Sequence, residues 1–491
     1  MNRKMICRIL GNILIFEAII LLLPFLVSII YKENDTAIYF VITSMISLAI
    51  GYILANLKTD NKHIYAKEGF IIVALSWIIV SLIGALPFYI SGEIPNYVDA
   101  FFETVSGFTT TGSSILTDVE ALARCSLFWR SFTHWVGGMG VFVFVLAFLP
   151  KSEGQNMFLM KAEVPGPVVG KLVSKVQMTA RILYGIYAFL TLLEVIFLLL
   201  GHMPLFDSIV HAFSTAGTGG YAIKNTSIAY YNSYYIDMVI TVFMLLFGIN
   251  FNLYYLLILK NIKQAFKSEE LRWYILIIVV FTGIITINTL GVYGSVAQSF
   301  RYSIFQVASI ITTTGFATTD FGMWPMLSQI LILLLMVVGA CAGSTGGGMK
   351  ISRIMILIKS AKSSVKKMVS PRSVSTINVE GKPADKQVLD FAYSYFVVYA
   401  LIFFASVLLL SFENLDIVTT LTAPLTCLGN VGPGFGDLIG PVGNFALLSN
   451  FSKIVLSFDM LAGRLELFPM ILLCYSIKDF ISNSIKETVK R

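Results

Sequence analysis

Four segments of the chain end in small and hydroxylated residues around one glycine, and these residues have the chemistry to bind an ion. Each segment has a semi-apolar run, then two or three small or hydroxylated residues, then the glycine. The glycines lie 108, 95 and 117 residues apart, so the chain repeats one unit four times. The four segments are DAFFETVSGFTTTGSS (99–114, with Gly112), DSIVHAFSTAGTGGYA (207–222, with Gly220), RYSIFQVASIITTTGFA (301–317, with Gly315) and TTLTAPLTCLGNVGPG (419–434, with Gly432).

A turn of this composition offers oxygen ligands to a cation. Backbone carbonyl groups can replace the hydration shell of a monovalent ion, and glycine adopts the φ values that let successive carbonyls face one way. Threonine hydroxyls add oxygens and hold the turn by local hydrogen bonds. These hard ligands suit an alkali cation and do not suit a soft metal. The predicted ion-binding residues are Thr110, Thr111, Gly112, Thr218, Gly219, Gly220, Thr313, Thr314, Gly315, Asn430, Val431 and Gly432.

The fourth turn, NVGPG (430–434), aligns with the T-V-G-Y-G filter of potassium channels through Val431 and Gly432. The other three turns keep only the central glycine. We therefore expect a filter of the potassium-channel type that is less regular and prefers K⁺ over Na⁺ less strongly. A short helix before each turn would point its C-terminal end, with its partial negative charge, at the ion.

The rest of the sequence predicts a membrane protein that positions these turns. Of its 491 residues, 56% are hydrophobic and only 13% are charged, and the mean hydropathy is +0.80. The first apolar window is too long for a signal peptide and lacks a cleavage site, so we predict a retained helix. Ten windows are long enough to cross a bilayer: 7–31, 37–57, 69–91, 128–150, 179–200, 234–259, 272–293, 326–357, 391–412 and 449–481.

The distribution of basic residues predicts the orientation. With a cytoplasmic N-terminus and ten spans, 28 of the 35 lysines and arginines fall on the cytoplasmic side, which is the expected bias. Both termini are therefore predicted to be cytoplasmic. This topology explains the net charge of +7, so no nucleic-acid partner is needed.

The predicted fold is an all-α polytopic membrane protein with four helix–pore-helix–helix repeats around a pseudo-fourfold pore. Two further transmembrane helices precede the repeats. Non-helical backbone is tolerated at membrane depth where protein buries it or where it lines a water-filled cavity, which suits four turns around one axis. The predicted boundaries are 1–68 for the N-terminal pair and 69–178, 179–271, 272–390 and 391–491 for repeats 1 to 4.

The eighth window is interrupted by GACAGSTGGGMK (339–350), whose five glycines each cost up to about 1 kcal/mol in helix propensity. One interpretation is a flexible loop that obstructs the pore beneath the filter and moves to open it. The alternative is a close-packed helix crossing made of small residues. The predicted gating residues in this segment are Gly343, Ser344, Thr345, Gly346, Gly347 and Gly348.

Arg464 lies inside the last apolar window, where a charge costs at least about 2.5 kcal/mol unless it faces a cavity or a partner. An ion pair with Glu466 or Asp459 is one explanation, although residues two apart on a helix point to different faces. The acids Glu17, Glu103 and Glu194 also lie in apolar surroundings. They are interpreted as buried acids paired with helix hydroxyls, and a coupling-ion or proton site is the alternative.

Taken together, the four glycine turns, GACAGSTGGGMK and MLAGRLELFP (460–469) make the chain from residue 69 onward resemble the Trk/Ktr superfamily of potassium uptake proteins. The helix pair within 7–57 favours the TrkH-type branch. The resemblance implies an intramembrane gating loop and places Arg464 in the pore below the filter as a barrier or latch. It also implies a dimer of this chain that meets a cytoplasmic TrkA-type subunit with nucleotide-binding domains.

The predicted function is K⁺ uptake across the bacterial cytoplasmic (inner) membrane through a gated, channel-like pore. K⁺ is the transported ion, and no covalent cofactor is expected. Coupling to Na⁺ or H⁺ stays open, since no residue set separates a channel from a symporter. The second candidate, a secondary transporter for another small solute, predicts two inverted halves with helix N-termini facing the substrate. An enzyme is not expected, because the sequence has no P-loop or dinucleotide fingerprint.

Overall fold

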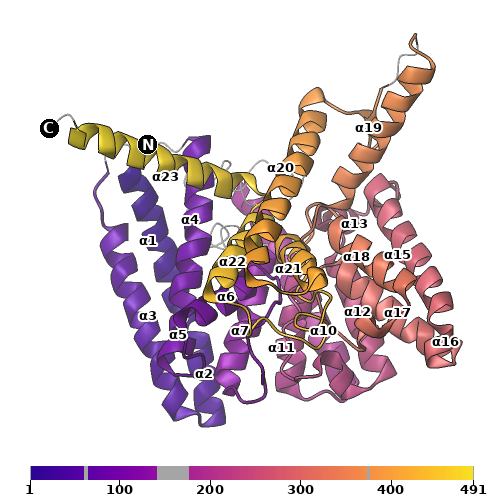
Figure 1. The fold of residues 1–491 in the computed structure, drawn as a ribbon. Coiled ribbons are helices and arrows are strands. Elements are labelled where there is room, and N and C mark those ends of the chain that lie inside the picture. The colour runs from indigo at the N-terminus through magenta and orange to yellow at the C-terminus, as the bar shows by residue number, and fades with distance from the viewer. Residues whose placement is uncertain (1, 60–64, 141–175, 373–375, 490–491) are drawn as a thin grey trace.

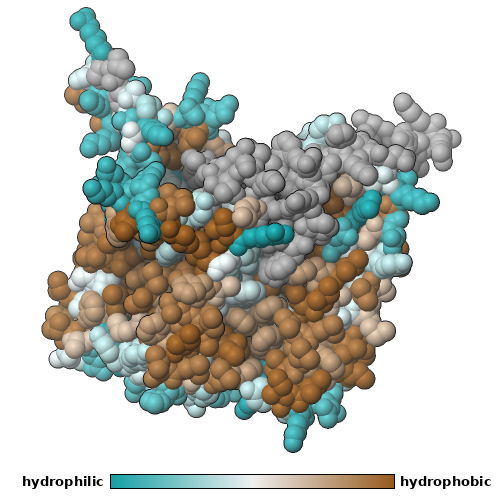
Figure 2. Space-filling view, turned by 180° about the vertical axis from the view of Figure 1, so that it is seen from behind, coloured by the Kyte–Doolittle hydropathy of each residue, from teal (hydrophilic) through white to brown (hydrophobic). Residues whose placement is uncertain are grey.

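The computed structural model describes residues 2–59, 65–140, 176–372 and 376–489. The regular secondary structure of this part of the chain is helical apart from one short hairpin, in which β1 (Asn378–Val379) pairs with β2 (Lys382–Pro383). The face drawn in Figure 2 has a broad band of apolar side chains across its middle, with hydrophilic side chains above and below it. The predicted class, an all-α polytopic membrane protein, is confirmed.

Six of the ten predicted windows are single helices, or gently bent pairs, long and apolar enough to cross a membrane within the described ranges. A seventh, 234–259, is bent by 90° at a break. The helices of the six spans are α1 (Arg3–Ile20), α2 (Leu22–Tyr31), α3 (Asn34–Ala55), α4 (Ala66–Gly84), α5 (Leu86–Ile90), α10 (Val176–Leu200), α15 (Glu269–Asn288) and α20 (Lys386–Leu410), the last continued by η3 (Ser411–Glu413).

The prediction that each of the ten windows is one helix, with only the eighth interrupted by glycines, is wrong for the windows 234–259 and 449–481. The break in the window 234–259 is at Gly248–Asn250, and the window 449–481 breaks after Arg464. The second half of the window 128–150 lies outside the described residues. So do four of the lysines that the predicted orientation counts on the cytoplasmic side, Lys151, Lys161, Lys171 and Lys175. The helices that follow the glycine turns in the four units are α7 (Arg124–Gly138), α12 (Tyr234–Phe247) with α13 (Phe251–Ile258), α18 (Met326–Val338) with α19 (Ile351–Val369), and α22 (Asn450–Arg464) with α23 (Phe468–Val489).

The last of these breaks turns the chain out of the bundle. Glu466 and Leu467 both have left-handed backbone, with φ of 60° and 65°, which no helix accommodates. Helix α23 then runs across one end of the bundle and packs on α4 (Figure 1). The N-terminal end of α1 lies at the same end, and α19 projects beyond it.

Four short helices precede the glycine turns, and their packing closes on itself. Each contacts the helix that follows it in the chain (α7, α12, α18 or α22) and also the corresponding helix of the preceding unit, and the first contacts that of the fourth (α6 on α22). The short helices therefore stand in one closed ring. They are α6 (Tyr97–Phe108), α11 (Leu205–Gly217), α17 (Val296–Ile311) and α21 (Ile417–Gly429), and the remaining short elements are η1 (Ser227–Tyr231), α14 (Ile262–Phe266), α16 (Leu290–Tyr293) and η2 (Phe321–Met323).

The N-terminal pair α1 and α3 packs closely because glycine stands at the crossing on both helices. A Cβ atom added to Gly11 would overlap the backbone of α3, and one added to Gly51 would come within 2.9 Å of the Gly11 carbonyl oxygen. Two serine hydroxyls of α3 donate to carbonyl oxygens of α1 at 2.7 and 2.8 Å. Small residues and interhelical hydrogen bonds of this kind drive helix association where lipid removes the hydrophobic driving force.

Candidate ion-conduction site

Each short helix ends in a turn with the same backbone path. The residue two positions before the glycine is left-handed in every unit, and so is the glycine itself. In each turn the amide of the residue before the glycine donates to the carbonyl five residues earlier, at 2.7–2.9 Å. The φ values are 54°, 56°, 57° and 53° at Thr110, Thr218, Thr313 and Asn430, and 82°, 75°, 84° and 102° at Gly112, Gly220, Gly315 and Gly432.

The four turns touch one another in cyclic order. A Cβ atom added to Gly112 would overlap the carbonyl oxygen of Gly219, in the second turn. In the same way Gly220 faces the carbonyl oxygen of Thr314, and Gly315 faces that of Val431. The circle closes where a Cβ on Gly432 would lie 2.7 Å from the Thr111 carbonyl oxygen. All twelve predicted ion-binding residues therefore lie in one ring, where glycine leaves room for the neighbouring carbonyl.

Side-chain hydrogen bonds also join the turns, as the hydroxyl-rich composition suggests. Thr111 Oγ1 lies 2.8 Å from Thr109 Oγ1 and accepts a hydrogen bond from Asn430 Nδ2 at 3.0 Å. Ser113 Oγ donates to the Gly432 carbonyl at 3.1 Å. The first and fourth turns are therefore joined by polar contacts as well as by packing.

The glycine-rich segment lies against the third and fourth turns. The Gly347 amide donates to Thr313 Oγ1 at 2.6 Å, and the Gly348 amide donates to the Gly429 carbonyl at 2.8 Å. A Cβ atom on Gly346 would lie 2.9 Å from the Thr312 carbonyl oxygen. The alternative of a close-packed helix crossing is wrong, because no helix runs through the segment between Val338 and Ile351.

Arg464 connects this glycine-rich loop to the opposite side of the ring. Its guanidinium donates to the Thr345 carbonyl at 2.7 Å and to the Gly138 carbonyl, at the end of α7, at 2.6 Å. The two acids considered as its partners are engaged elsewhere. Glu466 forms an ion pair with Arg353, and Asp459 accepts a hydrogen bond from Ser406 at 2.8 Å.

Two basic residues beside the loop were not singled out by sequence reasoning. Lys350 is only 2% exposed and donates from Nζ to the Gly346 carbonyl. Arg353 is 1% exposed and faces Glu466. In the sequence, only their position directly after the glycines signals this role. The loop is thus held by two cationic donors on adjacent carbonyls, Arg464 on Thr345 and Lys350 on Gly346.

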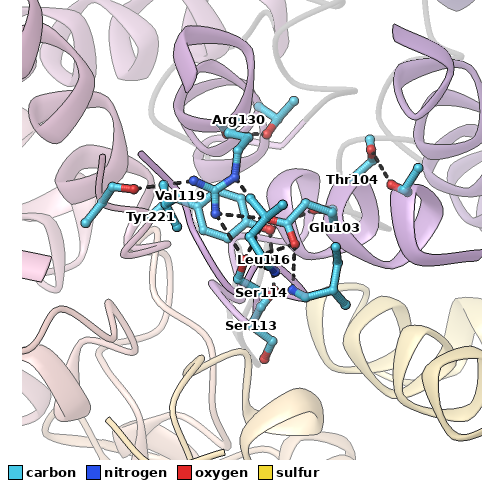
Figure 3. Close-up of polar contacts among 12 residues, drawn as sticks. Glu103, Thr104, Ser113, Ser114, Leu116, Val119, Arg130 and Tyr221 are labelled. Carbon is cyan, nitrogen blue, oxygen red and sulfur yellow. Dashed lines mark hydrogen bonds and ion pairs between the residues drawn. The ribbon is translucent and has the colours of Figure 1, made fainter. Parts of the chain in front are cut away.

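Glu103 has a stronger partner than the helix hydroxyls that the sequence suggested. It forms a buried ion pair with Arg130 of α7, with Arg130 Nε 2.8 Å from Glu103 Oε1. It also accepts hydrogen bonds from the Ser114 hydroxyl and from the Ile115 amide at 2.9 Å (Figure 3). Tyr221, after the second glycine, lies beneath the Arg130 guanidinium, whose Cζ atom is 3.9 Å from the ring centroid. Sequence reasoning missed Arg130, because nothing local relates residues 27 positions apart.

Outside the bundle, charged side chains link the segments that follow the first two turns. Lys224 Nζ donates to Glu120 at 2.7 Å, and Asn225 Nδ2 donates to Asp118 at 2.8 Å. The hydrogen bond from Lys224 lowers the pKa of Glu120, and the hydrogen bond from Asn225 lowers the pKa of Asp118. Both carboxyl groups are thus ionised in neutral solution.

Known proteins resemble this chain over nearly its whole length. The TrkH family model, described as "Cation transport protein", matches residues 37–483. The Trk system potassium uptake protein TrkH of Salmonella typhimurium is 35% identical over 483 residues, covering 96% of this chain and 98% of the relative. TrkG of Escherichia coli K12 is 34% identical over 479 residues, with 96% and 97% covered. The crystal structure of the potassium transporter TrkH from Vibrio parahaemolyticus superposes with a TM-score of 0.87 at 34% identity, covering 96% of this chain and 98% of that one.

Proposed function

The chain belongs to the TrkH family of cation transport proteins and takes up potassium ions, and we propose that these ions cross the membrane through the ring of four turns. The observation that carries this proposal is the cyclic contact of the turns, in which each glycine receives a carbonyl of its neighbour. Main-chain carbonyls held around one axis can replace the water that K⁺ leaves behind. The protein is a transporter and not an enzyme.

The polarity of the short helices supports this assignment over the broken-helix transporter considered as the alternative. All four turns follow C-terminal helix ends, where the partial negative charge favours a cation. The alternative, transport of an anionic or organic solute, would place helix N-termini at the site.

The glycine-rich loop is proposed as the gate, and Arg464 as its latch. The loop lies against two of the four turns, and Arg464 ties it to α7 at Gly138 across the structure. Opening would break the hydrogen bond from Arg464 to Thr345 and leave the hydrogen bonds from Arg464 to α7 in place. The driving force is the membrane potential, about 2.3 kcal/mol per charge for each 100 mV. Coupling of K⁺ to Na⁺ or H⁺ is the second candidate mechanism.

We also propose the inner-membrane topology with both termini cytoplasmic, because the N-terminal end of α1 and the whole of α23 lie at one end of the bundle. The relatives are named as proteins of a Trk system, and the word system supports a transporter with further subunits. Helix α19 projects at the same end, and Val365 and Met368 are 60% and 81% exposed among its lysines. This projection is proposed to meet a TrkA-type cytoplasmic subunit, with the chain itself as a dimer.

The experiment is growth rescue of a bacterium that lacks its own K⁺ uptake, in medium of low K⁺, followed by rubidium uptake with Na⁺ as competitor. The unaltered chain should rescue growth. Gly315→Ser should lose discrimination, because the added side chain meets the Val431 carbonyl at a positive φ. The matched control is Gly291→Ser in the same unit, where a Cβ atom has open space. If Gly315→Ser transports and discriminates like the parent, the ring of turns is not the filter.

A further inference from the structure

The ion pair of Glu103 and Arg130 contacts the segments that leave the first two turns (Figure 3). Glu103 accepts from the Ile115 amide, three residues after the first glycine, at 2.9 Å. Arg130 Nη1 donates to the carbonyl of Ala222, two residues after the second glycine, at 3.3 Å. We propose that Arg130 is a positioning residue that fixes the first and second turns relative to each other and so sets the preference for K⁺ over Na⁺. This inference rests on the proposed function of the ring.

In the third and fourth units, hydrogen bonds from the short helix of the same unit hold the turn. Six residues before the glycine, Ser309 and Thr426 donate hydroxyl hydrogen bonds to the carbonyl that directly follows the glycine, at 2.7 and 3.0 Å. Nine residues before the glycine, Gln306 donates to Thr318 at 3.4 Å. In these units a side chain of the short helix reaches the segment that leaves the turn.

The second unit has side chains at the same two positions, but they make no such bond. Ser214 Oγ and His211 Nε2 are buried without a hydrogen-bond partner among the described residues. The segment that leaves the second turn is held from the first unit. Tyr221 donates its hydroxyl to the Glu103 carbonyl at 2.7 Å, and Arg130 donates to the Ala222 carbonyl. Arg130 therefore donates to the segment that leaves the second turn a hydrogen bond of the kind that the short helix donates in the third and fourth units.

The chemistry of the pair suits this double role. The side chains of Arg130 and Glu103 are 2% and 0% exposed, so removal of either would leave an uncompensated buried charge. A guanidinium presents several donors in a fixed planar fork, and Arg130 uses them for Glu103, for Ser114 and for Ala222. Lysine keeps the charge but has a single ammonium group, so it cannot hold all three in this geometry. Arg130→Lys therefore separates positioning from charge.

The test measures the K⁺ to Na⁺ permeability ratio of the purified full chain in liposomes, together with its thermal unfolding. We expect Arg130→Lys and Glu103→Gln to lower the ratio by about tenfold, the lower end of the factor that loss of one charge-assisted hydrogen bond represents. The matched control is Arg301→Gln. Arg301 forms a 2.7 Å ion pair with Asp237, with side chains 14% and 1% exposed, and no hydrogen bond described for it reaches a turn. This variant should lose stability but keep the ratio.

The outcomes separate this inference from the proposed function. If the unaltered chain does not conduct K⁺ in preference to Na⁺, the proposed function fails. If it does, and Arg130→Lys and Glu103→Gln keep its ratio, the positioning role is refuted; the same holds if Arg301→Gln lowers the ratio equally. If neither of the first two variants folds, Tyr221→Phe decides, because it keeps the ring beneath Arg130 and removes only the hydroxyl that joins the second turn to the main-chain carbonyls of Glu103 and Ser113 in the first unit. A lowered ratio in this variant supports the role, and an unchanged ratio overturns it.

Discussion

Replacing Arg464 by alanine should open the pore, because this side chain bridges the glycine-rich loop and the end of α7. The guanidinium donates to the Thr345 carbonyl at 2.7 Å on the loop side and to the Gly138 carbonyl at 2.6 Å on the other side. With alanine the bridge is lost, while Lys350 still donates to the neighbouring Gly346 carbonyl. The loop should therefore remain in place but be held less firmly.

The size of the effect follows from the number of bonds that differ between the closed and open states. Only the hydrogen bond to Thr345 must break when the loop leaves, because the bonds to α7 do not involve it. A hydrogen bond from a charged donor contributes about 1.5–3 kcal/mol. Its loss would shift the equilibrium toward the open state by about ten- to a hundredfold.

The assay is single-channel recording of the purified chain in planar bilayers, without any regulatory subunit. Arg464→Ala should raise the open probability, and Arg464→Lys should raise it less, since lysine keeps the charge and can still donate to one carbonyl. The Lys350→Met variant should also raise it, since its Nζ holds the adjacent carbonyl. If Arg464→Ala leaves the open probability unchanged or lowers it, Arg464 is not a latch.

Three further predictions concern stability. Gly11→Val inserts atoms into the α1–α3 crossing, which should cost about 1–3 kcal/mol of stability and lower the unfolding temperature in detergent. Gly283→Val is the control, because a Cβ atom there has open space, and it should leave the unfolding temperature unchanged. Equal effects of the two variants would argue against the close crossing. Glu466→Gln should cost about 3–5 kcal/mol in denaturant unfolding, because it leaves Arg353, whose side chain is 1% exposed, without a counter-charge, and an unchanged midpoint would contradict this. The lowered pKa of Glu120 means that the stability from its bond to lysine is complete above the ordinary carboxyl range and is lost as pH falls through the lowered pKa. The advantage of the parent over Glu120→Gln in thermal unfolding should therefore persist at pH 5 and vanish only at pH values below the ordinary carboxyl range, and its loss already at pH 6 would refute the assignment.

The sequence made the turns predictable because their composition conflicts with their surroundings. Threonine and glycine are poor residues for a lipid-facing helix, so Thr313 and Gly315 predict non-helical backbone between two apolar runs. The fourfold spacing then indicated a ring. The left-handed backbone at Asn430 and at the three equivalent threonines was not predicted, since it depends on how the helix end meets the neighbouring turn.

The breaks in the second helices were missed because long apolar runs flank each of them on both sides. The chain leaves the helix at Gly248, and Asn250 begins the next helix by capping it. At the end of α22 the left-handed residues are Glu466 and Leu467, neither of which is a turn residue by type. Tertiary contacts set these breaks. A Cβ atom on Gly248 would meet the Tyr274 hydroxyl, from a helix that a local window does not include.

The buried cations follow from the same irregular backbone. Carbonyl groups that no helix satisfies are costly at membrane depth, and so are lysine and arginine. Each cost offsets the other where Arg130 meets Ala222, where Lys350 meets the glycine-rich loop and where Arg464 meets the end of α7. The ring itself is different. The main-chain hydrogen bonds described for Arg130, Lys350 and Arg464 go to carbonyls outside residues 110–112, 218–220, 313–315 and 430–432. A protein cation there would compete with the transported ion, whereas the Ser113 hydroxyl that donates to the Gly432 carbonyl is neutral and brings no competing charge.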